Sequence, residues 1–481
     1  MNEFSSTSRR SSRFAMAAVL ALGAVAIGLR FRNAWVYPLG MGFDAQGNWA
    51  YIDSLRSLWV LPDPETTWSA AHPPLFYALS AALSFVLGHP EPHAVVIATR
   101  FFSTAVGLGA IGAIMVWVRR FDPSQPERAW LSGALVLFLP VHIYMSAMLS
   151  EEILVSSLRT FVVLGVLTDL RGDSGVARAW IWGVLAGLAL LTKLSGLLLV
   201  IAAGGAYLLA GWSGRGVRWG AVRGLALGLG AFCTGGWFYV YRWWTRGYFY
   251  PSGLEIHRIM FEMPPGERTL SDYFSFPFSS LTGSDLLTAD LIHSVWGSTY
   301  ATIWFDGHRH FLPLEAPGLM LAGGVIGFLG LIPTVAFVIG SIRGARRMVK
   351  KANPIDGLLL GLIVFNLAGY ALFTWRNPWF ATLKGSYLLG LIAPFAIYAS
   401  ESLSAGWRFL RDRAQVGASL GAAGLLILWI TVTLTFASEG VFSKREYPGL
   451  DWRRASPNRP PLPDEENESL RNSPVSKVHP R

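Results

Sequence analysis

The sequence contains almost no cysteine and few charged residues. Cys233 is its single cysteine and lies within an apolar run, so the chain forms neither an internal disulfide framework nor a cysteine-based metal site. Asp, Glu, Lys and Arg together make up 15% of the 481 residues, against roughly a quarter in soluble domains. This shortage of charge argues against a soluble globular protein.

Apolar residues dominate instead. Hydrophobic side chains account for 52% of the chain and aromatic ones for 13%. They are grouped in runs of the length that a helix needs to cross the hydrocarbon core, about 20 residues. The runs lie near residues 14–31, 95–118, 129–148, 153–170, 179–193, 194–211, 222–244, 317–342, 356–375, 385–400 and 415–437. The sequence therefore predicts an all-α polytopic membrane protein with about 11 transmembrane helices.

The formal net charge of +10 raises the question of an anionic partner. Lys and Arg, however, are grouped in short clusters between the apolar runs, such as RGARRMVKK at 343–351 and RFLRDR at 408–413. Clusters of this kind mark the cytoplasmic loops of membrane proteins. The basic charge therefore indicates membrane topology, and we expect the lipid bilayer and no nucleic acid as a partner.

Residues 73–88, PPLFYALSAALSFVLG, decide the orientation of everything that follows them. If this run crosses the membrane, the basic loops fall on the outer side, against the positive-inside rule. If it lies at the interface or re-enters, all of those loops are cytoplasmic. The second alternative is favoured. The basic N-terminus resembles a secretory or twin-arginine signal, but no small-residue cleavage site follows, so we expect an uncleaved first helix with a cytoplasmic N-terminus in the inner (plasma) membrane.

This topology divides the chain into five segments. They are a cytoplasmic N-terminal segment (1–13), a main transmembrane module (14–244) whose first outer loop is 32–93, an outer or periplasmic segment (245–316), C-terminal transmembrane helices (317–437) and a disordered tail (438–481). The tail is polar and rich in proline, which is typical of disorder.

Two unusual polar residues lie in the first outer loop. Asp44 occurs in MGFDAQGNWAYI (41–52), directly after the first apolar run. It fits a helix N-cap before Ala45, but it also places a carboxylate at the membrane surface. His72 occurs in AAHPPLFYAL, where two prolines fix how the next helix begins and therefore where His72 points.

The next outer turns carry acids and a lysine. Glu151 and Glu152 join two apolar runs; they are either solvated or face a cleft, where paired acids suit a metal ion or a sugar hydroxyl. Lys193 lies between two further apolar runs in LALLTKLSG. Its ammonium either extends to the membrane interface or contacts an anion.

A third outer turn, RNPWFATLK, is bracketed by Arg376 and Lys384, with Tyr387 about one helical turn further on. Two cations at this depth suit a lipid phosphate, which Arg can bind with two parallel hydrogen bonds. General interface anchoring together with Trp375 and Trp379 is the alternative.

The segment HSVWGSTYATIWFDGHRHF (293–311) is rich in aromatic residues. Trp296 suits stacking on a sugar ring or interfacial packing, and Asp306 adds a carboxylate. His308 and His310 are spaced as metal ligands can be, but no third ligand lies at a helpful spacing.

Four stretches together resemble a known family: FDAQGNWAYIDSLRSLWVLPDPETTWSAAHPPLFYAL, SEEILVSSLRTFVVL, LALLTKLSGLL and KGSYLLGLIAPF. They resemble the membrane glycosyltransferases of the C type (GT-C), in the superfamily of protein O-mannosyltransferases and lipid A aminoarabinose transferases. The resemblance covers residues 14–210 well and 376–400 moderately. It implies a GT-C-like bundle with an interfacial or re-entrant helix in the first outer loop.

The resemblance also implies an enzyme, a hexosyl- or pentosyltransferase that uses a polyprenyl-phosphate sugar. Asp44 matches the essential aspartate of the first outer loop, which acts as catalytic base or orients the acceptor. Glu151 or Glu152 matches the second acidic position, and Lys384 and Tyr387 match a stretch that contacts the lipid phosphate. The expected substrate-binding residues are His72, Glu151, Glu152, Lys193, Trp296, Asp306, Arg376, Lys384 and Tyr387.

The expected reaction moves the sugar to an acceptor hydroxyl on the periplasmic or extracellular side, with inversion. The acceptor is an envelope glycan, a lipid or a protein, and a divalent cation is left open as a cofactor. Two other classes stay open. One is a transporter or flippase for a lipid-linked glycan, although no internal repeat is visible. The other is an inactive scaffold of the same fold, suggested by Ala45, where many members have Glu, and Asn48, where a similar subgroup has His.

Overall fold

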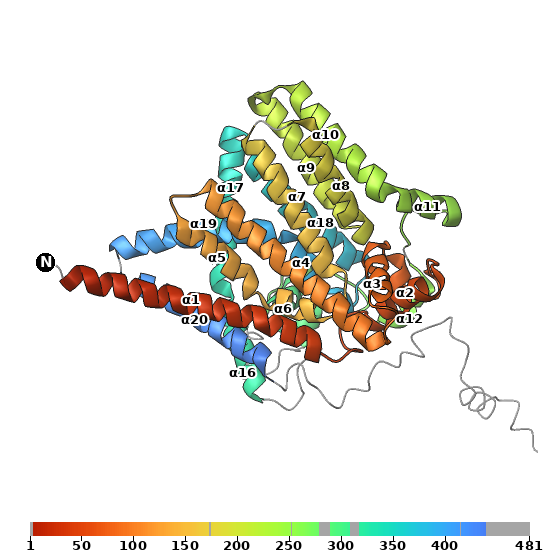
Figure 1. Ribbon diagram of the computed structural model, residues 1–481, viewed down its shortest axis with the longest axis horizontal. Helices are drawn as coiled ribbons and strands as arrows, with labels where there is room; N and C mark the ends of the chain where they lie inside the picture. The colour runs from red at the N-terminus through yellow and green to blue at the C-terminus, as the bar shows by residue number, and fades with distance from the viewer. Residues whose placement is uncertain are drawn as a thin grey trace, which may run out of the picture.

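The computed structural model describes residues 3–172, 175–251, 253–278, 289–307, 317–413 and 415–438. Every regular element within these ranges is a helix (Figure 1). Seven helices are long and apolar enough to cross a membrane, or eight if a bent pair, α5 with α6, forms one span. The predicted all-α polytopic membrane fold is confirmed, whereas the count of 11 spans stays a prediction. His308, His310 and the tail beyond residue 438 lie outside the described residues.

The longer helices are α1 (Glu3–Val36), α2 (Ala45–Leu58), α3 (Leu75–Val86), α4 (Pro92–Phe121), α5 (Pro126–Leu137), α6 (Pro140–Ala147), α7 (Glu152–Arg171), α8 (Val176–Thr192), α9 (Gly196–Ala210), α10 (Val217–Ala231), α11 (Trp237–Arg246), α15 (Val295–Trp304), α16 (Pro317–Leu329), α17 (Leu331–Lys351), α18 (Pro354–Arg376), α19 (Ile392–Arg413) and α20 (Gln415–Ala437). The shorter ones are η1 (Trp68–Ala71), η2 (Gly211–Arg215), η3 (Phe232–Gly236), α12 (Glu255–Phe261), η4 (Leu270–Tyr273), α14 (Ala289–His293), η5 (Phe380–Thr382) and η6 (Gly385–Leu391).

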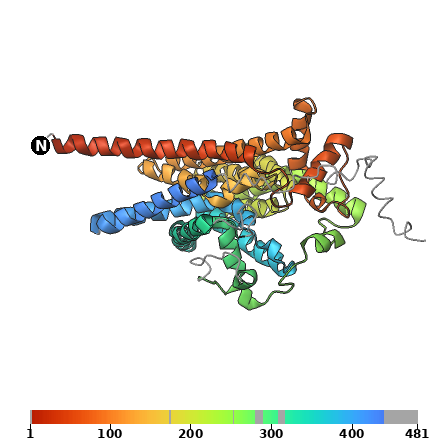
Figure 2. The same ribbon diagram turned by 90° about the horizontal axis from the view of Figure 1, so that it is seen from below.

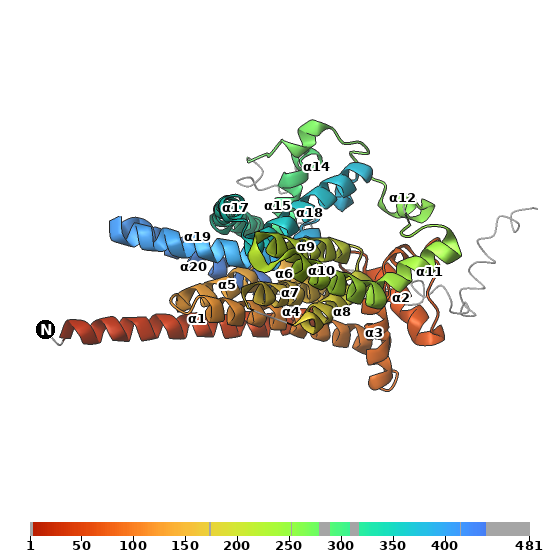
Figure 3. The ribbon, with the colours of Figure 1, turned by 90° about the horizontal axis from the view of Figure 1, so that it is seen from above.

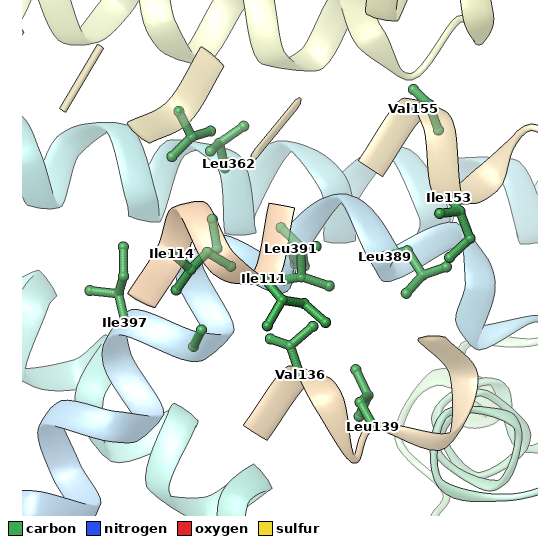
Figure 4. Close-up of a cluster of buried hydrophobic side chains, with 14 of the residues drawn as sticks. Ile111, Ile114, Val136, Leu139, Ile153, Val155, Leu362, Leu389, Leu391 and Ile397 are labelled. Atoms are coloured by element: carbon green, nitrogen blue, oxygen red, sulfur yellow. The ribbon is translucent and has the colours of Figure 1, made fainter. Parts of the chain in front are cut away.

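Helix α7 forms the centre of the bundle. Apolar residues occur on every side of it, together with buried polar ones such as Arg159 and Asp169. This pattern is expected of a helix surrounded by protein, and 83% of its most apolar stretch is buried. Helices α4, α8, α9, α18 and α19 contact it. Figure 4 shows part of the resulting core, in which Ile153 of α7 lies beside Leu389 of η6. The segment that begins at Glu152 is therefore held from several sides.

The other helices are arranged in layers around this core. Helices α8, α9 and α10 pack together on one side of α7 (Figure 1). On the other side α1 contacts α4, α6 and α20 and runs along one edge of the molecule, opposite α14 and α15 (Figures 2 and 3). Helices α2 and α3 pack against each other at one end of the bundle.

The run at 73–88 forms α3, which has 12 residues. At roughly 1.5 Å per residue it is about 18 Å long, well short of the roughly 30 Å of hydrocarbon that a spanning helix must cross. The helix is therefore shorter than a straight span requires, and the interfacial position of this run stays a prediction.

A glycine sets the close approach of α8 and α10. A β-carbon built on Gly183 would overlap the backbone carbonyl of Leu227, which is buried. The backbone of α10 cannot move aside without disturbing its own hydrogen bonds. This contact therefore requires glycine, although glycine weakens a helix by about 1 kcal/mol relative to alanine.

Replacing Gly183 by alanine is expected to lower the free energy of unfolding by about 1–3 kcal/mol, as overpacking does elsewhere. Thermal unfolding of the detergent-solubilised protein measures this change. The matched control is Gly204→Ala on α9, where a β-carbon meets nothing within 4 Å and the gain in helix propensity leaves stability equal or higher. Equal melting temperatures for the Gly183 variant and the wild type would contradict the prediction.

Candidate active site

Four segments that are distant in the sequence end at the same place in the fold. They are the start of α2 after Asp44, the start of α7 after Glu151, the turn between α8 and α9 at Lys193, and the start of η6 after Lys384. Each end carries a charged side chain, and these side chains form ion pairs. Asp44 pairs with Lys384 at 3.5 Å, and Lys193 pairs with Glu151 and Glu152 at 2.8 and 2.7 Å. The sequence predicted all of these residues, but only the fold brings them together.

Lys193 joins both glutamates. Its Nζ donates to Oε1 of Glu151 at 2.8 Å and to Oε1 of Glu152 at 2.7 Å. Both glutamates are buried, at 4% and 5% exposure, so neither is a solvated turn residue. Burial is the largest single influence on Glu151 and opposes its ionisation. The charge and hydrogen bond of Lys193, together with His72, outweigh burial, and the pKa of Glu151 is lowered to about 2. The lysine therefore points into the protein rather than to the membrane interface.

Asp44 occupies the N-cap position of α2 without acting as a cap. Its side chain makes no capping hydrogen bond, and its backbone is left-handed, with φ 59° and ψ 18°. A cap residue ordinarily has an extended backbone, and a left-handed one is uncommon outside glycine, asparagine and aspartate. Oδ2 of Asp44 instead lies 3.5 Å from Nζ of Lys384. With 26% of its side chain exposed, this carboxylate remains accessible to a substrate.

Lys384 is almost completely buried, with 7% of its side chain exposed. Its Nζ lies 4.4 Å from the centre of the Phe43 ring and 5.9 Å from that of Tyr387. Nζ of Lys193 lies 5.0 Å from the same Tyr387 ring. Both ammonium groups thus lie within cation–π range of the Tyr387 ring, which attracts each of them.

His72 adds a fifth segment to the site. Its Nε2 lies 3.9 Å from Oε1 of Glu151, and its Nδ1 is buried without a partner among the described residues. Burial lowers the pKa of His72, and the Glu151 carboxylate opposes that shift only in part. At neutral pH the imidazole is therefore uncharged and able to exchange hydrogen bonds with a substrate.

Asn48 has a structural role on the inner face of α2. It is 1% exposed; its Nδ2 donates to the carbonyl of Leu149 at 2.8 Å, and the Tyr77 hydroxyl donates to its Oδ1 at 3.0 Å. These bonds tie α2 both to the turn before Glu151 and to α3. The residue that departs from the family pattern thus fixes the distance between the Asp44 loop and the two glutamates.

Arg242 of α11 is a residue near the site that the sequence did not indicate. It is 3% exposed, its Nη2 donates to the carbonyl of Ala70 at 2.5 Å, and its guanidinium lies 5.0 Å from the Phe238 ring. Its Nη1 is buried without a partner among the described residues. The bond spans 172 positions of sequence, so no local pattern could have revealed it.

Three expected site residues lie apart from this cluster. Trp296 packs on Tyr370 at 6.0 Å between ring centres, and Tyr370 in turn lies 6.2 Å from Tyr387. Asp306 is buried, at 3% exposure, after the end of α15. Arg376 ends α18 as an exposed side chain and makes no ion pair with a described residue. Their substrate-binding roles stay predictions.

A metal site was left open by the sequence. Within the described ranges, no three His, Cys, Asp or Glu side chains lie close enough together to hold a metal ion. The three carboxylates of the cluster are instead paired with the two ammonium groups of Lys193 and Lys384.

No protein-family model and no curated protein matches the chain. Among solved structures, the oligosaccharyltransferase of Archaeoglobus fulgidus in complex with zinc and sulfate matches with a TM-score of 0.53 and 15% identity, over 95% of this chain and 55% of that chain. Its apo form matches with a TM-score of 0.51 and 14% identity, over 94% and 59%. The chain thus spans a little over half the length of these structures.

A third match is ArnT of Cupriavidus metallidurans bound to undecaprenyl phosphate, with 18% identity over 84% of this chain and 81% of that chain. Its TM-score of 0.38 is too low to support an argument. At 14–15% identity the two archaeal matches establish the fold alone. As the sequence resemblance predicted, the chain is a multi-pass membrane protein with the fold of the GT-C type glycosyltransferases.

Proposed function

We propose that this protein transfers a sugar from a polyprenyl-phosphate donor to an acceptor hydroxyl at the outer face of the membrane. The observation that carries the proposal is the Asp44–Lys384 pair, an accessible carboxylate 3.5 Å from a buried ammonium. The Glu151–Lys193–Glu152 cluster adjoins it. Base and cation are the two groups that glycosyl transfer from a phosphate requires, and the GT-C type fold supports their use in this reaction.

In the proposed reaction the acceptor oxygen forms a bond to the anomeric carbon as the bond from that carbon to the phosphate oxygen breaks. Asp44 takes the proton of the acceptor hydroxyl. The electron pair of the broken bond leaves on the polyprenyl phosphate, where Lys384 and Lys193 stabilise the negative charge. The sugar becomes positively charged in the transition state, and in-line attack inverts the anomeric centre.

The bilayer supports the choice of donor. A polyprenyl tail stays in the hydrocarbon, so its phosphate lies at the membrane surface, at the level where α7 begins and α8 ends. A sugar placed between Asp44 and Lys384 separates this pair, leaving the ammonium for the phosphate and the carboxylate for the acceptor. His72 and the glutamates are the groups available to sugar hydroxyls. The sugar and the acceptor, whether envelope glycan, lipid or protein, are open within this proposal.

The test uses the purified protein in liposomes with a panel of polyprenyl-phosphate hexoses and pentoses and a membrane extract as acceptor. Release of free polyprenyl phosphate is measured, because it reports transfer to any acceptor. We expect one donor to be consumed. Movement of an intact lipid-linked sugar across the liposome bilayer without its consumption would instead establish the transporter. If neither occurs with any donor, the scaffold alternative holds.

A further inference from the structure

A polar cavity lies at the end of α7 that is distant from the candidate active site. This helix has 20 residues, from Glu152 to Arg171, and is therefore about 30 Å long, which matches the hydrocarbon thickness. A cavity of about 320 Å³ opens beside Arg171, between α4, α5, α7, α17, α18 and α19. It lies at the membrane face opposite Glu152. Its charged lining residues are Asp122, Arg128, Arg171, Arg347, Asp356 and Glu401.

The wall formed by α17, α18 and α19 has one negative charge in excess, because a single guanidinium serves two carboxylates. Nε and Nη2 of Arg347 bind the two oxygens of Asp356 at 2.9 and 2.8 Å, and its Nη1 binds Oε1 of Glu401 at 2.6 Å. Asp356 also accepts from Asn353 and Tyr398 and has 3% of its side chain exposed. Oε2 of Glu401 also lies 3.3 Å from Nη2 of Arg347 and 3.8 Å from Nη2 of Arg128 on the facing wall. In this network two guanidiniums serve three carboxylates, those of Asp122, Asp356 and Glu401. Glu401, at 26% exposure, therefore presents the excess negative charge to the cavity.

The wall formed by α4, α5 and α7 has one positive charge in excess. Arg128 is paired with Asp122 at 2.8 Å and reaches Glu401 of the facing wall at 3.8 Å, but its Nε is buried without a partner among the described residues. Arg171 forms no ion pair with any described residue; its guanidinium lies 5.1 and 4.8 Å from the rings of Trp117 and Phe121. Its single hydrogen bond within the described residues, to the carbonyl of Phe121, is long, at 3.5 Å. This wall therefore offers unused N–H donors.

The cavity as a whole is neutral, with opposite charges in excess on two walls. A lone anion would meet Glu401 and Asp122, and a lone cation would meet Arg171, so either one leaves a charge unbalanced. A ligand with one charge of each sign matches both walls. We propose that this cavity binds a phosphoethanolamine group, with the phosphate at Arg171 and Arg128 and the ammonium at Glu401. The group belongs either to a membrane phospholipid or to a soluble molecule, and the site is independent of the proposed transferase reaction.

The test is native mass spectrometry of the full chain in detergent micelles. Phosphatidylethanolamine, phosphatidylglycerol and soluble phosphoethanolamine are added at equal concentrations. We expect at least tenfold more bound phosphatidylethanolamine than phosphatidylglycerol. Arg171→Gln and Glu401→Gln should each reduce that binding at least fivefold. Arg119→Gln, at an exposed residue of the same membrane face that does not line the cavity, should leave it unchanged.

Competition by the soluble compound identifies the source. If phosphoethanolamine displaces the lipid from the wild-type protein, the ligand is soluble; if it does not, the lipid headgroup is the ligand. Equal binding of the two lipids would overturn the proposal, as would an unchanged affinity in both folded variants. Melting temperatures establish whether the variants are folded. If they are not folded, the preference of the wild-type protein for phosphatidylethanolamine over phosphatidylglycerol tests the proposal on its own.

Discussion

Replacing Asp44 by asparagine is expected to reduce glycosyl transfer about 10²- to 10⁴-fold, the range over which a general base accelerates a reaction. Asparagine has the same shape, but its amide cannot take the proton of the acceptor hydroxyl. It also tolerates the left-handed backbone found at this position, φ 59°, nearly as well as aspartate does. The loss should therefore appear in kcat, measured as release of polyprenyl phosphate, with little change in the amount of folded protein.

The control for this variant lies on the same helix. Asp53 of α2 forms a pair with Arg56 of the same helix at 3.0 Å. Asp53→Asn is expected to keep wild-type activity. Transfer by Asp44→Asn at the wild-type rate would remove Asp44 as the base. A loss of activity in both variants would indicate a structural effect on α2 instead.

The sequence predicted the fold class and most of the candidate cluster, because both depend on local patterns. Apolar runs identify membrane helices directly, and the prolines after His72 mark the start of a short helix. Charged residues at the ends of apolar runs, such as Glu151, Lys193 and Lys384, are noticeable because charge is costly at a membrane boundary. The resemblance then assigned roles that spacing alone could not assign.

The pairing of these residues could not be predicted, because it depends on how helices pack. Nothing in the sequence indicates that Lys193 binds both glutamates or that Lys384 faces Asp44; these contacts join positions 41 or more residues apart. Arg242 was missed for the same reason. Asn48 was interpreted as a departure from the family pattern that weakens the case for catalysis, whereas its two hydrogen bonds position the Asp44 loop.

Replacing Lys193 by methionine is expected to lower the free energy of unfolding by about 3–5 kcal/mol at pH 7.5, the cost of removing one partner of a buried ion pair. Glu151 and Glu152 would then be two buried carboxylates without the ammonium that now binds both within 2.8 Å. Thermal unfolding in detergent measures the loss. The matched variant, Lys193→Met with Glu152→Gln, removes one of the two charges and should recover part of it.

The pH dependence separates this explanation from a simple packing defect. In the wild type the pKa of Glu151 is lowered to about 2. Its contribution to stability is therefore fully present above the unfolded pKa, about 4.3, and is lost as pH falls through the lower folded pKa. In Lys193→Met, burial and the neighbouring Glu152 carboxylate raise the pKa of Glu151 above the unfolded value. Folding then favours the protonated carboxyl group, so the variant loses stability as pH rises through this raised pKa.

Lys193→Met should therefore become more stable relative to the wild type as pH falls from 7.5 to 5.5. Protonation of His72 beside Glu151 acts in the same direction, because it returns a cation to one of the two carboxylates. The double variant, which retains a single carboxylate, should show a smaller slope. If the difference in stability between Lys193→Met and the wild type stayed constant over this range, the lysine would contribute by packing alone, and the two glutamates would not need its charge.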